Sequence, residues 1–377
     1  MKRWIAASVI LLIGLFSSRL ISPSQDVDLY VRNRVSELSL HDYVAPRYTA
    51  SFGSRSEKSR PGQASFSEVV TSPRDLQVPN GLKVMVFSPH PDDETLGAGG
   101  LVQRVIANDG AVRVVFMTNG DGYKEAFATP NRPGKPSSED FIEYGKMRQE
   151  EARHALCELG LSSEDGLFLG FPDDGIDELW TSYWSRRTPY TSPYTQADRP
   201  PYEESFSRWS KYAGADLEAA IRRAMKDFTP DWIVIPDPRD QHPDHACTGV
   251  FVLDSLRKLN QSGDLSFQNT QVLTYLVHFA GYPDSQRWLR TIKKAGIAGS
   301  LASVRLLSPT RWVSLPLSSA ELARKARALA AHQSQFEMLG GFFRIYVRHR
   351  EVFGRLEPTQ ILAVPQEYAA RFSRPST

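Results

Sequence analysis

The stretch L-K-V-M-V-F-S-P-H-P-D-D-E, residues 82–94, joins a short apolar run to a dense polar cluster. Its first part, residues 82–87, has the length and composition of a buried β-strand. The polar side chains that follow directly are His90, Asp92, Asp93 and Glu94. Neighbouring carboxylates repel one another and burial adds a desolvation cost, which a divalent cation would offset. Taken alone, the segment is equally compatible with acidic residues that cap a helix N-terminus.

A second segment has the same arrangement. Residues 232–235 form a strand-like run that leads into P-D-P-R-D-Q-H-P-D-H, residues 236–245. The carboxyl ends of parallel strands lie at one edge of a sheet, so both polar clusters meet there if the sheet is parallel. His90, Asp93 and His245 then supply two imidazoles and one carboxylate, a common catalytic zinc set with one position open for water. We therefore predict one Zn²⁺ per chain at this edge.

Strands and helices alternate along the rest of the sequence. Short apolar runs indicate strands at residues 82–87, 112–117, 167–170, 232–235 and 272–277. Helical patterns occur at residues 95–108, 139–159, 215–228, 245–259 and 318–332. This order predicts an α/β fold: a Rossmann-like, mostly parallel sheet with helices on both faces and the active site at the carboxyl-terminal edge of the strands.

The 377-residue chain divides into three parts by composition. Residues 1–21 place Lys2 and Arg3 before an apolar run, the pattern of a signal peptide or an N-terminal membrane anchor. We therefore expect an exported or membrane-anchored protein whose main domain is extracytoplasmic. Residues 22–80 are rich in Ser, Pro and Arg and predict a stem or surface-wrapping segment. Residues 81–377 form the main domain, with an aromatic-rich insertion at about 172–206.

Overall charge and cysteine content exclude some functions. The formal net charge of +2 provides no strong field for a polyanion, so we expect no nucleic-acid partner. The two cysteines, Cys157 and Cys247, are too few for a disulfide framework or a cysteine zinc site. We expect two buried free thiols, with a single disulfide as the alternative.

The segments P-H-P-D-D-E and H-P-D-H, in this order and at this spacing, resemble the zinc-dependent deacetylases that include N-acetylglucosaminyl-phosphatidylinositol de-N-acetylases, mycothiol-pathway deacetylases and LmbE-like proteins. The resemblance covers about residues 82–335. Further similar segments are T-N-G-D at 118–121, R-Q-E-E-A at 148–152, F-L-G-F-P-D-D-G at 168–175 and A-L-A-A-H-Q-S-Q at 328–335. This resemblance implies zinc-dependent removal of the acetyl group from an N-acetylglucosamine-type sugar in a glycoconjugate or polysaccharide.

The resemblance also implies roles for individual residues. His90, Asp93 and His245 match the zinc ligands, and Asp92 matches the general base that takes a proton from metal-activated water. His242 matches the histidine that polarises the substrate carbonyl or protonates the leaving amine, a proton that Asp92 could equally deliver. As an imidazolium, His242 would also stabilise the oxyanion. The remaining positions implied by the resemblance are Asp244, which orients His242, and the substrate-binding residues Arg148, Asp173 and Asp121. Asp240 stands where some members of the family carry a tyrosine.

Two alternatives to a deacetylase are a metal-dependent phosphoesterase and a non-catalytic sugar-binding protein. A phosphoesterase usually needs a second metal or a basic phosphate clamp, and the sequence shows neither clearly. The expected partner in each sugar-related function is an N-acetylated sugar or glycan, with membrane attachment possible through the N-terminus. The aromatic insertion either stacks on sugar rings or packs against the domain. His278, at the end of a predicted strand, either lines the pocket or is a core histidine.

Overall fold

A β-sheet organises the part of the chain that the computed structural model describes, residues 74–127, 135–279, 282 and 311–357. In the order in which they lie side by side, its eight strands are β1 (Arg74–Asp75), β7 (Arg311–Pro316), β8 (Arg350–Leu356), β6 (Gln271–Tyr275), β5 (Trp232–Pro236), β2 (Lys83–Ser88), β3 (Ala111–Thr118) and β4 (Gly166–Phe171). All neighbours are parallel except at β8, which is antiparallel to β6 and β7. The prediction of a mostly parallel sheet is therefore confirmed.

The strand order reverses at the centre of this sheet. Strand β2 pairs with β3 on one side and with β5 on the other, all in parallel. The chain moves outward from β2 through β3 to β4, and outward from β5 to β6 in the opposite direction. The loops that follow β2 and β5 therefore diverge at the carboxyl ends of these two strands, the position of the ligand-binding crevice in open α/β sheets. Both polar segments of the sequence lie in these two loops.

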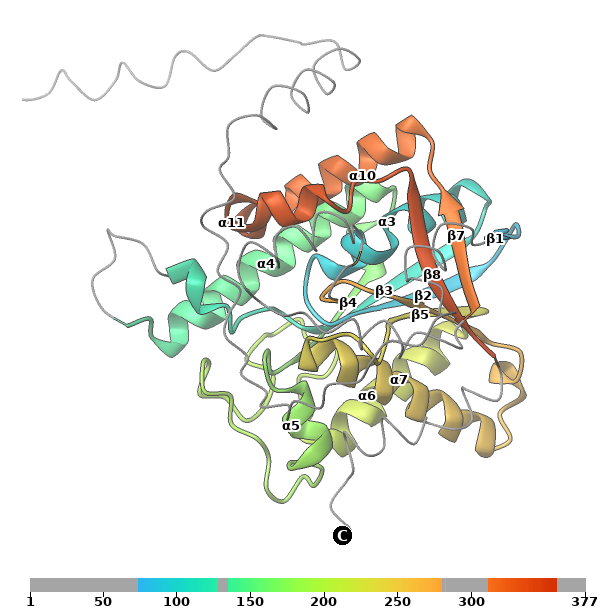
Figure 1. Ribbon diagram of the computed structural model, residues 1–377. Coiled ribbons are helices and arrows are strands. Elements are labelled where there is room, and N and C mark those ends of the chain that lie inside the picture. The colour runs from blue at the N-terminus through green and yellow to red at the C-terminus, as the bar shows by residue number, and fades with distance from the viewer. Residues whose placement is uncertain (1–73, 128–134, 280–281, 283–310, 358–377) are drawn as a thin grey trace, which may run out of the picture. The chain divides into compact units, whose positions relative to one another are not determined.

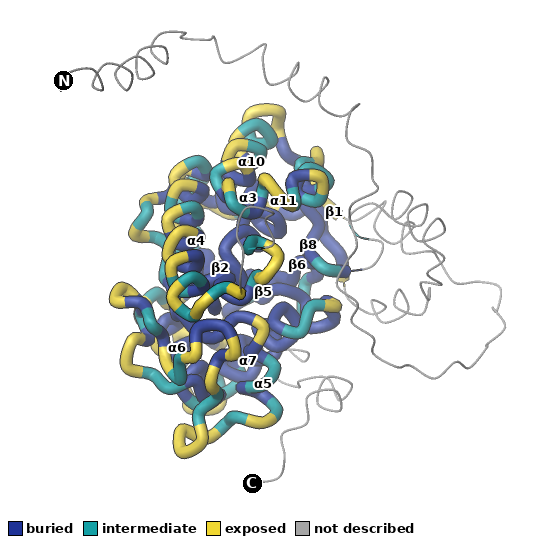
Figure 2. Tube along the Cα trace, turned by 90° about the vertical axis from the view of Figure 1, so that its left-hand side faces the viewer, coloured by how far each residue is buried: buried dark blue, intermediate teal, exposed yellow. Residues whose placement is uncertain are grey.

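Alternate side chains of β2 enter two separate hydrophobic cores. Val84 and Val86 belong to the core of one face, and Met85 and Phe87 belong to the core of the other. Figure 1 shows α3 (Asp93–Ala107), α4 (Ser138–Leu159), α10 (Ser319–Ala331) and α11 (Gln333–Arg344) on one face, and α5 (Ile176–Thr181), α6 (Gly214–Phe228) and α7 (Pro243–Gln261) on the other. In Figure 2 the central strands are buried and the exposed residues lie on the helices and loops around them. A sheet covered on both faces explains why its strands read as continuous apolar runs.

Local sequence signals set the ends of the long helices. Helix α4 begins with a capping box between Ser137 and Asp140, and α10 begins with one between Ser318 and Glu321. Helix α4 ends at Gly160, whose φ of 96° is a left-handed conformation that glycine adopts without strain. These boundaries lie within one or two residues of the predicted ones.

The structure contains elements that the sequence pattern did not predict. Strands β7 and β8 and helix α11 all lie in the C-terminal part of the described chain. At the other end, the sheet starts before residue 81, because β1 pairs with β7 and Leu76 is buried in the core. The predicted leader, residues 1–21, and most of the predicted stem lie outside the described residues.

The aromatic insertion packs against the domain. Trp180, Tyr194 and Tyr202 each expose 7% or less of their surface. The Trp180 ring lies edge-on against Phe251 of α7, with ring centroids 4.9 Å apart. The insertion was predicted either to stack on sugar rings or to pack against the domain, and these side chains pack against the domain.

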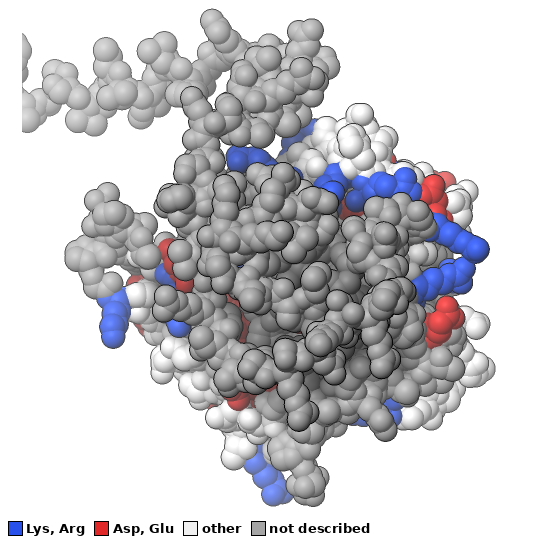
Figure 3. Space-filling model, viewed as in Figure 1, with Lys and Arg blue, Asp and Glu red and all other residues white. Residues whose placement is uncertain are grey.

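Cys157 and Cys247, both in the described part of the chain, form no disulfide, as expected, but Cys157 is exposed and only Cys247 is buried. The expectation of two buried thiols is therefore wrong for Cys157, which lies on the outer side of α4. Among the described helices, none combines the length and the apolar character needed to cross a bilayer. On the described surface in Figure 3, basic and acidic side chains are interspersed, in keeping with the small net charge.

Candidate active site

The loop between β2 and α3 is held by donors from neighbouring elements. Its residues Pro89 and Pro91 have no N–H, and their carbonyl groups need partners. Thr118, at the end of β3, donates from both its backbone N–H and its hydroxyl to the Pro89 carbonyl, at 3.0 and 2.9 Å. The Arg148 guanidinium donates to the Pro91 carbonyl at 2.6 Å. The position of His90 between the two prolines is therefore fixed from outside the loop.

Asp92 has a strained backbone at the start of α3. Its φ of 135° and ψ of −31° lie in a region that residues with a Cβ rarely adopt, at a cost of about 1–3 kcal/mol. Its N–H donates to Glu94 at 3.0 Å, and its carboxylate accepts a charged hydrogen bond from Arg148 at 3.1 Å. Such strain persists only where surrounding contacts impose it. Here the Asp92 carboxylate contacts Arg148, whereas the Asp93 carboxylate contacts His90 and His245.

His90, Asp93 and His245 come together at the crevice. A potential ligand atom from each lies within 4.8 Å of the corresponding atoms of the other two. The Asp93 carboxylate oxygen Oδ2 lies 3.1 Å from His90 Nδ1 and 3.1 Å from His245 Nε2. Ligands that share a tetrahedral zinc at about 2.0–2.1 Å lie about 3.3 Å apart, so these separations suit a shared ion. Asp93 and His245 are buried, and His90 is at the limit of burial with 9% exposed.

Two further observations fit a cation at this place. Neither ring nitrogen of His245 makes a well-aligned hydrogen bond, although both are buried and have carboxylates nearby. Burial works to lower the pKa of His90, but the carboxylates of Asp173, Asp244 and Asp93 outweigh burial and hold that pKa well above its usual value. Carboxylates that stabilise a protonated imidazole would also stabilise a metal cation. The residues present therefore fit a divalent metal.

The Asp240 carboxylate faces His245 from the side opposite Asp93. It lies 3.6 Å from His245 Nδ1, while His245 Nε2 faces Asp93. The same carboxylate accepts the N–H groups of Val277 and His278, each at 3.0 Å, and so ties the loop after β5 to the end of β6. Burial opposes ionisation of Asp240, but the nearby His245 outweighs it and lowers the pKa of Asp240 to about 2. A carboxylate on the far nitrogen is the usual support of a metal-binding histidine.

His242 lies beside these groups at the N-terminus of α7. Its Nδ1 accepts the N–H of Asp244 at 3.3 Å, so the neutral ring carries its proton on Nε2. Burial, together with the charges of His90, His245 and His278, lowers the pKa of His242 well below its usual value. The expectation of an imidazolium therefore finds no support in this environment, which favours a neutral ring.

The Asp244 carboxylate contacts backbone N–H groups of the loop after β4 and the ring of His90. It accepts the N–H groups of Asp174 and Ile176, at 2.7 and 2.9 Å, and lies 3.3 Å from His90 Nε2. Asp244 thus joins the loop after β4 to the loop after β5. Its relation to His242 is through its backbone N–H, and the predicted orienting role of its carboxylate stays a prediction.

The three predicted substrate-binding residues surround the same crevice. Asp173 lies 3.0 Å from His90 Nε2 and accepts the N–H of Gly122 at 2.7 Å. Arg148 donates to the Gly120 carbonyl at 2.8 Å as well as to the β2–α3 loop, and it is 4% exposed. Asp121 is buried and accepts the hydroxyl of Tyr202. In these contacts Arg148 and Asp121 support the loops, and their contact with a substrate stays a prediction.

The sequence-based prediction assigned no specific role to Glu94, and it did not name its partner His332, which lies 3.1 Å away. His278 was predicted either to line the pocket or to be a core histidine, and its ring lies 4.9 Å from that of His245. His278 also stacks on Phe342, at 5.5 Å between centroids, so it belongs to the site and packs against α11 as well. His332 lies in the A-L-A-A-H-Q-S-Q segment, and that signal could have pointed to it.

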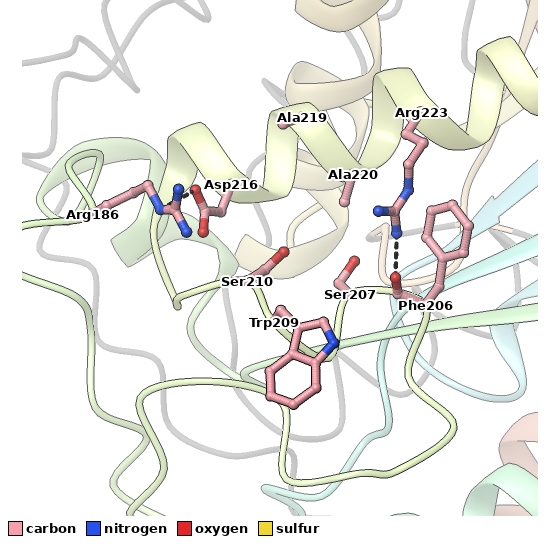
Figure 4. Close-up of a pocket in the computed structure, with 9 residues that line it drawn as sticks. All are labelled: Arg186, Phe206, Ser207, Trp209, Ser210, Asp216, Ala219, Ala220 and Arg223. Carbon is pink, nitrogen blue, oxygen red and sulfur yellow. Dashed lines mark hydrogen bonds and ion pairs between the residues drawn. The ribbon is translucent and has the colours of Figure 1, made fainter.

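A separate cavity of about 310 Å³ lies between α6 and residues 206–210 (Figure 4). Arg186 pairs with Asp216 at 3.0 Å on one side of it, and Arg223 donates to the Phe206 carbonyl on the other. None of the predicted site residues lines this cavity. The cavity is therefore distinct from the crevice at the ends of β2 and β5.

Known proteins resemble this chain over the same region. The family model of PIG-L, GlcNAc-PI de-N-acetylase, matches residues 85–256. A glucosamine-6-phosphate deaminase-like protein of Bacteroides thetaiotaomicron is 24% identical over 71% of this chain and 38% of its own length. A 1D-myo-inositol 2-acetamido-2-deoxy-alpha-D-glucopyranoside deacetylase of Mycobacterium sp. (strain KMS) is 29% identical over 44% of this chain and 47% of its own length. The chain thus spans less than half the length of these curated relatives.

Among solved structures, the N,N'-diacetylchitobiose deacetylase from Pyrococcus horikoshii is 18% identical, with a TM-score of 0.44 over 74% of this chain and 85% of that protein. The family match spans β2, the β2–α3 loop, β5 and most of α7, and so contains both segments that form the crevice. Residues 85–256 of the chain, which hold both segments of the candidate site, are therefore similar to the PIG-L family of GlcNAc-PI de-N-acetylases.

Proposed function

We propose that this chain is a zinc-dependent hydrolase that removes the N-acetyl group from an N-acetylglucosamine-type sugar in a glycoconjugate or polysaccharide. The observation that carries the proposal is the convergence of His90, Asp93 and His245 with an adjacent carboxylate, Asp92, outside the ligand set. A metal site beside a carboxylate that can act as a base is one arrangement that hydrolyses an unreactive amide. The family model and the named activity of the mycobacterial relative support an N-acetylated amino sugar as the substrate.

His90, Asp93 and His245 would hold the metal. When bound, a divalent ion lowers the pKa of water and withdraws electrons from the amide carbonyl. Zinc is the proposed ion because two imidazoles and one carboxylate, with an open position, suit it. The buried carboxylates around His90 would keep the ion in place without a second metal.

Asp92 accepts the proton of the attacking water. Burial and the neighbouring Asp93 charge raise the pKa of Asp92 to about 7, and a bound cation would lower it toward the carboxylate form that a base requires. Arg148 and Glu94 fix its side chain and backbone. Once protonated, Asp92 can return the proton to the departing amine nitrogen, which leaves acetate and the free amino sugar as products.

His242 serves as a neutral hydrogen-bond donor. With Nδ1 occupied by the Asp244 N–H, its Nε2–H is available for the oxygen that becomes negative when water adds to the carbonyl. Because its environment opposes a positive charge, His242 is a poor source of the proton for the amine. Asp92 is therefore the better candidate for that step. Asp173, at the edge of the same group, is proposed to contact the sugar.

The remaining parts of the proposal concern the setting of the enzyme. The basic residues and apolar run of residues 1–21 support export or membrane anchoring, with the substrate a cell-envelope glycan. These residues lie outside the described structure, and comparing the mass of the mature protein with that of the full chain would test cleavage.

One experiment separates the proposed activity from its alternatives. The purified chain, supplied with zinc, is incubated with N-acetylglucosamine oligomers and, separately, with phosphate esters of the same sugars. We expect acetate release from the first and no phosphate release from the second. Phosphate release would indicate a phosphoesterase, and sugar binding without any product would indicate a non-catalytic binding protein.

A further inference from the structure

Two buried basic side chains approach α3 from α10 and from its C-terminal end. Lys325 lies within α10, and His332 is the C-cap residue that follows Ala331, with a non-helical ψ of 60°. Lys325 is 0% exposed and His332 is 1% exposed. Ala328 and Leu329 between them are buried in the hydrophobic core with α3. Helix α10 and its C-cap thus present two polar groups to α3 across an otherwise apolar contact.

His332 reaches the acidic start of α3. Its Nε2 lies 3.1 Å from Glu94 Oε1. The other carboxylate oxygen of Glu94 accepts the N–H of Asp92 at 3.0 Å and the Ser88 hydroxyl at 3.3 Å. A continuous chain of contacts therefore runs from His332 through Glu94 to the backbone of Asp92, the residue with the strained φ of 135°.

Lys325 holds α3 one turn further along. Its ammonium donates to the Leu96 carbonyl at 2.9 Å and pairs with Glu351 at 2.6 Å. Glu351 in turn accepts the N–H of Gly100 at 2.7 Å. The Leu96 carbonyl and the Gly100 N–H would bond to each other in a regular helix, and here each has a partner on the Lys325–Glu351 pair. Helix α3 is therefore fixed relative to α10 at two successive points.

We propose that His332 is a positioning residue: acting through Glu94, it holds the strained backbone of Asp92 so that this carboxylate is directed as a base and not as a metal ligand. The role in catalysis rests on the proposed function, whereas the structural link to Asp92 does not. Buried ion pairs contribute little net stability compared with apolar side chains of similar size. The His332–Glu94 pair, in contrast, places a hydrogen-bond acceptor on the N–H of the strained Asp92, which apolar side chains could not do.

The test compares two substitutions of His332, made in the full chain, that differ in whether they keep a hydrogen-bond donor to Glu94. His332→Gln keeps a donor close to the place of Nε2, whereas His332→Phe keeps the ring volume and removes the donor. His154→Ala, at an exposed histidine of α4, is the control. Hydrogen–deuterium exchange is read by mass spectrometry in peptides covering residues 89–96, in which Pro89 and Pro91 contribute no amide. Zinc content, kcat and KM for acetate release are measured on the same samples.

For His332→Phe we expect deuterium uptake at the Asp92 amide to be at least about 10-fold faster. We expect kcat to fall about 10- to 100-fold, with KM within about threefold and zinc retained. His332→Gln should keep both the exchange rate at the Asp92 amide and kcat close to the wild-type values. His154→Ala should change neither quantity. If His332→Phe does not fold, His332→Leu takes its place with the same expectations.

Two results would overturn the proposal. One is wild-type exchange at Asp92 in the variant that lacks the donor. The other is faster exchange spread equally over β3 and α4 with loss of zinc, which would indicate a purely structural role. If the wild-type chain releases no acetate from any sugar, the proposed function fails, but the exchange data still decide whether His332 holds Asp92.

Discussion

Replacing Asp92 by Asn tests the assignment of the general base. The substitution keeps the size of the side chain and an acceptor for Arg148, but it removes the group that takes a proton. Loss of general-base catalysis costs about 10²- to 10⁴-fold in rate. At about 1.4 kcal/mol per factor of ten, the barrier should rise by about 3–5 kcal/mol. Because Asp92 lies outside the trio His90, Asp93 and His245, the zinc content should stay at about one per chain.

The stability of this variant should change less than its activity. Arg148 would lose a charged partner at 3.1 Å but keep the carbonyls of Pro91 and Gly120. We expect the free energy of unfolding to fall by about 1–3 kcal/mol. The assay is acetate release at saturating substrate, with zinc measured on the same sample and Asp227→Asn, at an exposed position of α6, as the control. Wild-type turnover in Asp92→Asn, or loss of its zinc, would refute the assignment.

Three further substitutions or reactions test other parts of the structure. His245→Ala should reduce bound zinc from about one per chain to near zero, and retention of zinc would remove this residue from the ligand set. Gly97→Ala would place a methyl group 2.3 Å from the Tyr275 ring and should lower the free energy of unfolding by about 1–3 kcal/mol. Gly341→Ala, where nothing lies within 4 Å, is its control, and equal unfolding midpoints would contradict the packing. Cys157 should react with a thiol reagent in the folded protein without loss of activity, and a second equivalent should react only after unfolding.

The central strands could be predicted because each is buried on both faces. Their side chains enter two cores, so the apolar runs are short and uninterrupted and their ends are marked by polar loops. Strands β7 and β8 lack this signal. In β8, R-E-V-F-G-R-L, charged residues and Gly354 interrupt the apolar run, and its pairing with β7 depends on tertiary structure. Two consecutive glycines, Gly340 and Gly341, likewise weaken the helical signal of α11.

The candidate ligands could be predicted because they follow strand ends directly. The parallel sheet then places the two segments at one edge, and the structure brings His90, Asp93 and His245 together there. The supporting contacts could not be predicted in the same way. Glu94 and His332 are 238 residues apart in the sequence, and their contact depends on how α10 packs on α3.

The same limit applies to the direction of a side chain. The resemblance implies that Asp244 orients His242, and this role stays a prediction. In the structure the Asp244 carboxylate accepts the backbone N–H groups of Asp174 and Ile176. These residues lie 70 and 68 positions earlier in the chain, so the contacts depend on how the loop after β4 packs and could not be predicted from the local sequence.

Acetate release from an N-acetylglucosamine oligomer, measured before and after the metal is removed, tests zinc-dependent deacetylation most directly. The purified chain is assayed as loaded with zinc, after treatment with a chelator, and after zinc is added back. We predict that acetate release stops on chelation and returns with zinc. Continued release without metal, or no release from a chain that binds one zinc ion, would contradict zinc-dependent deacetylation.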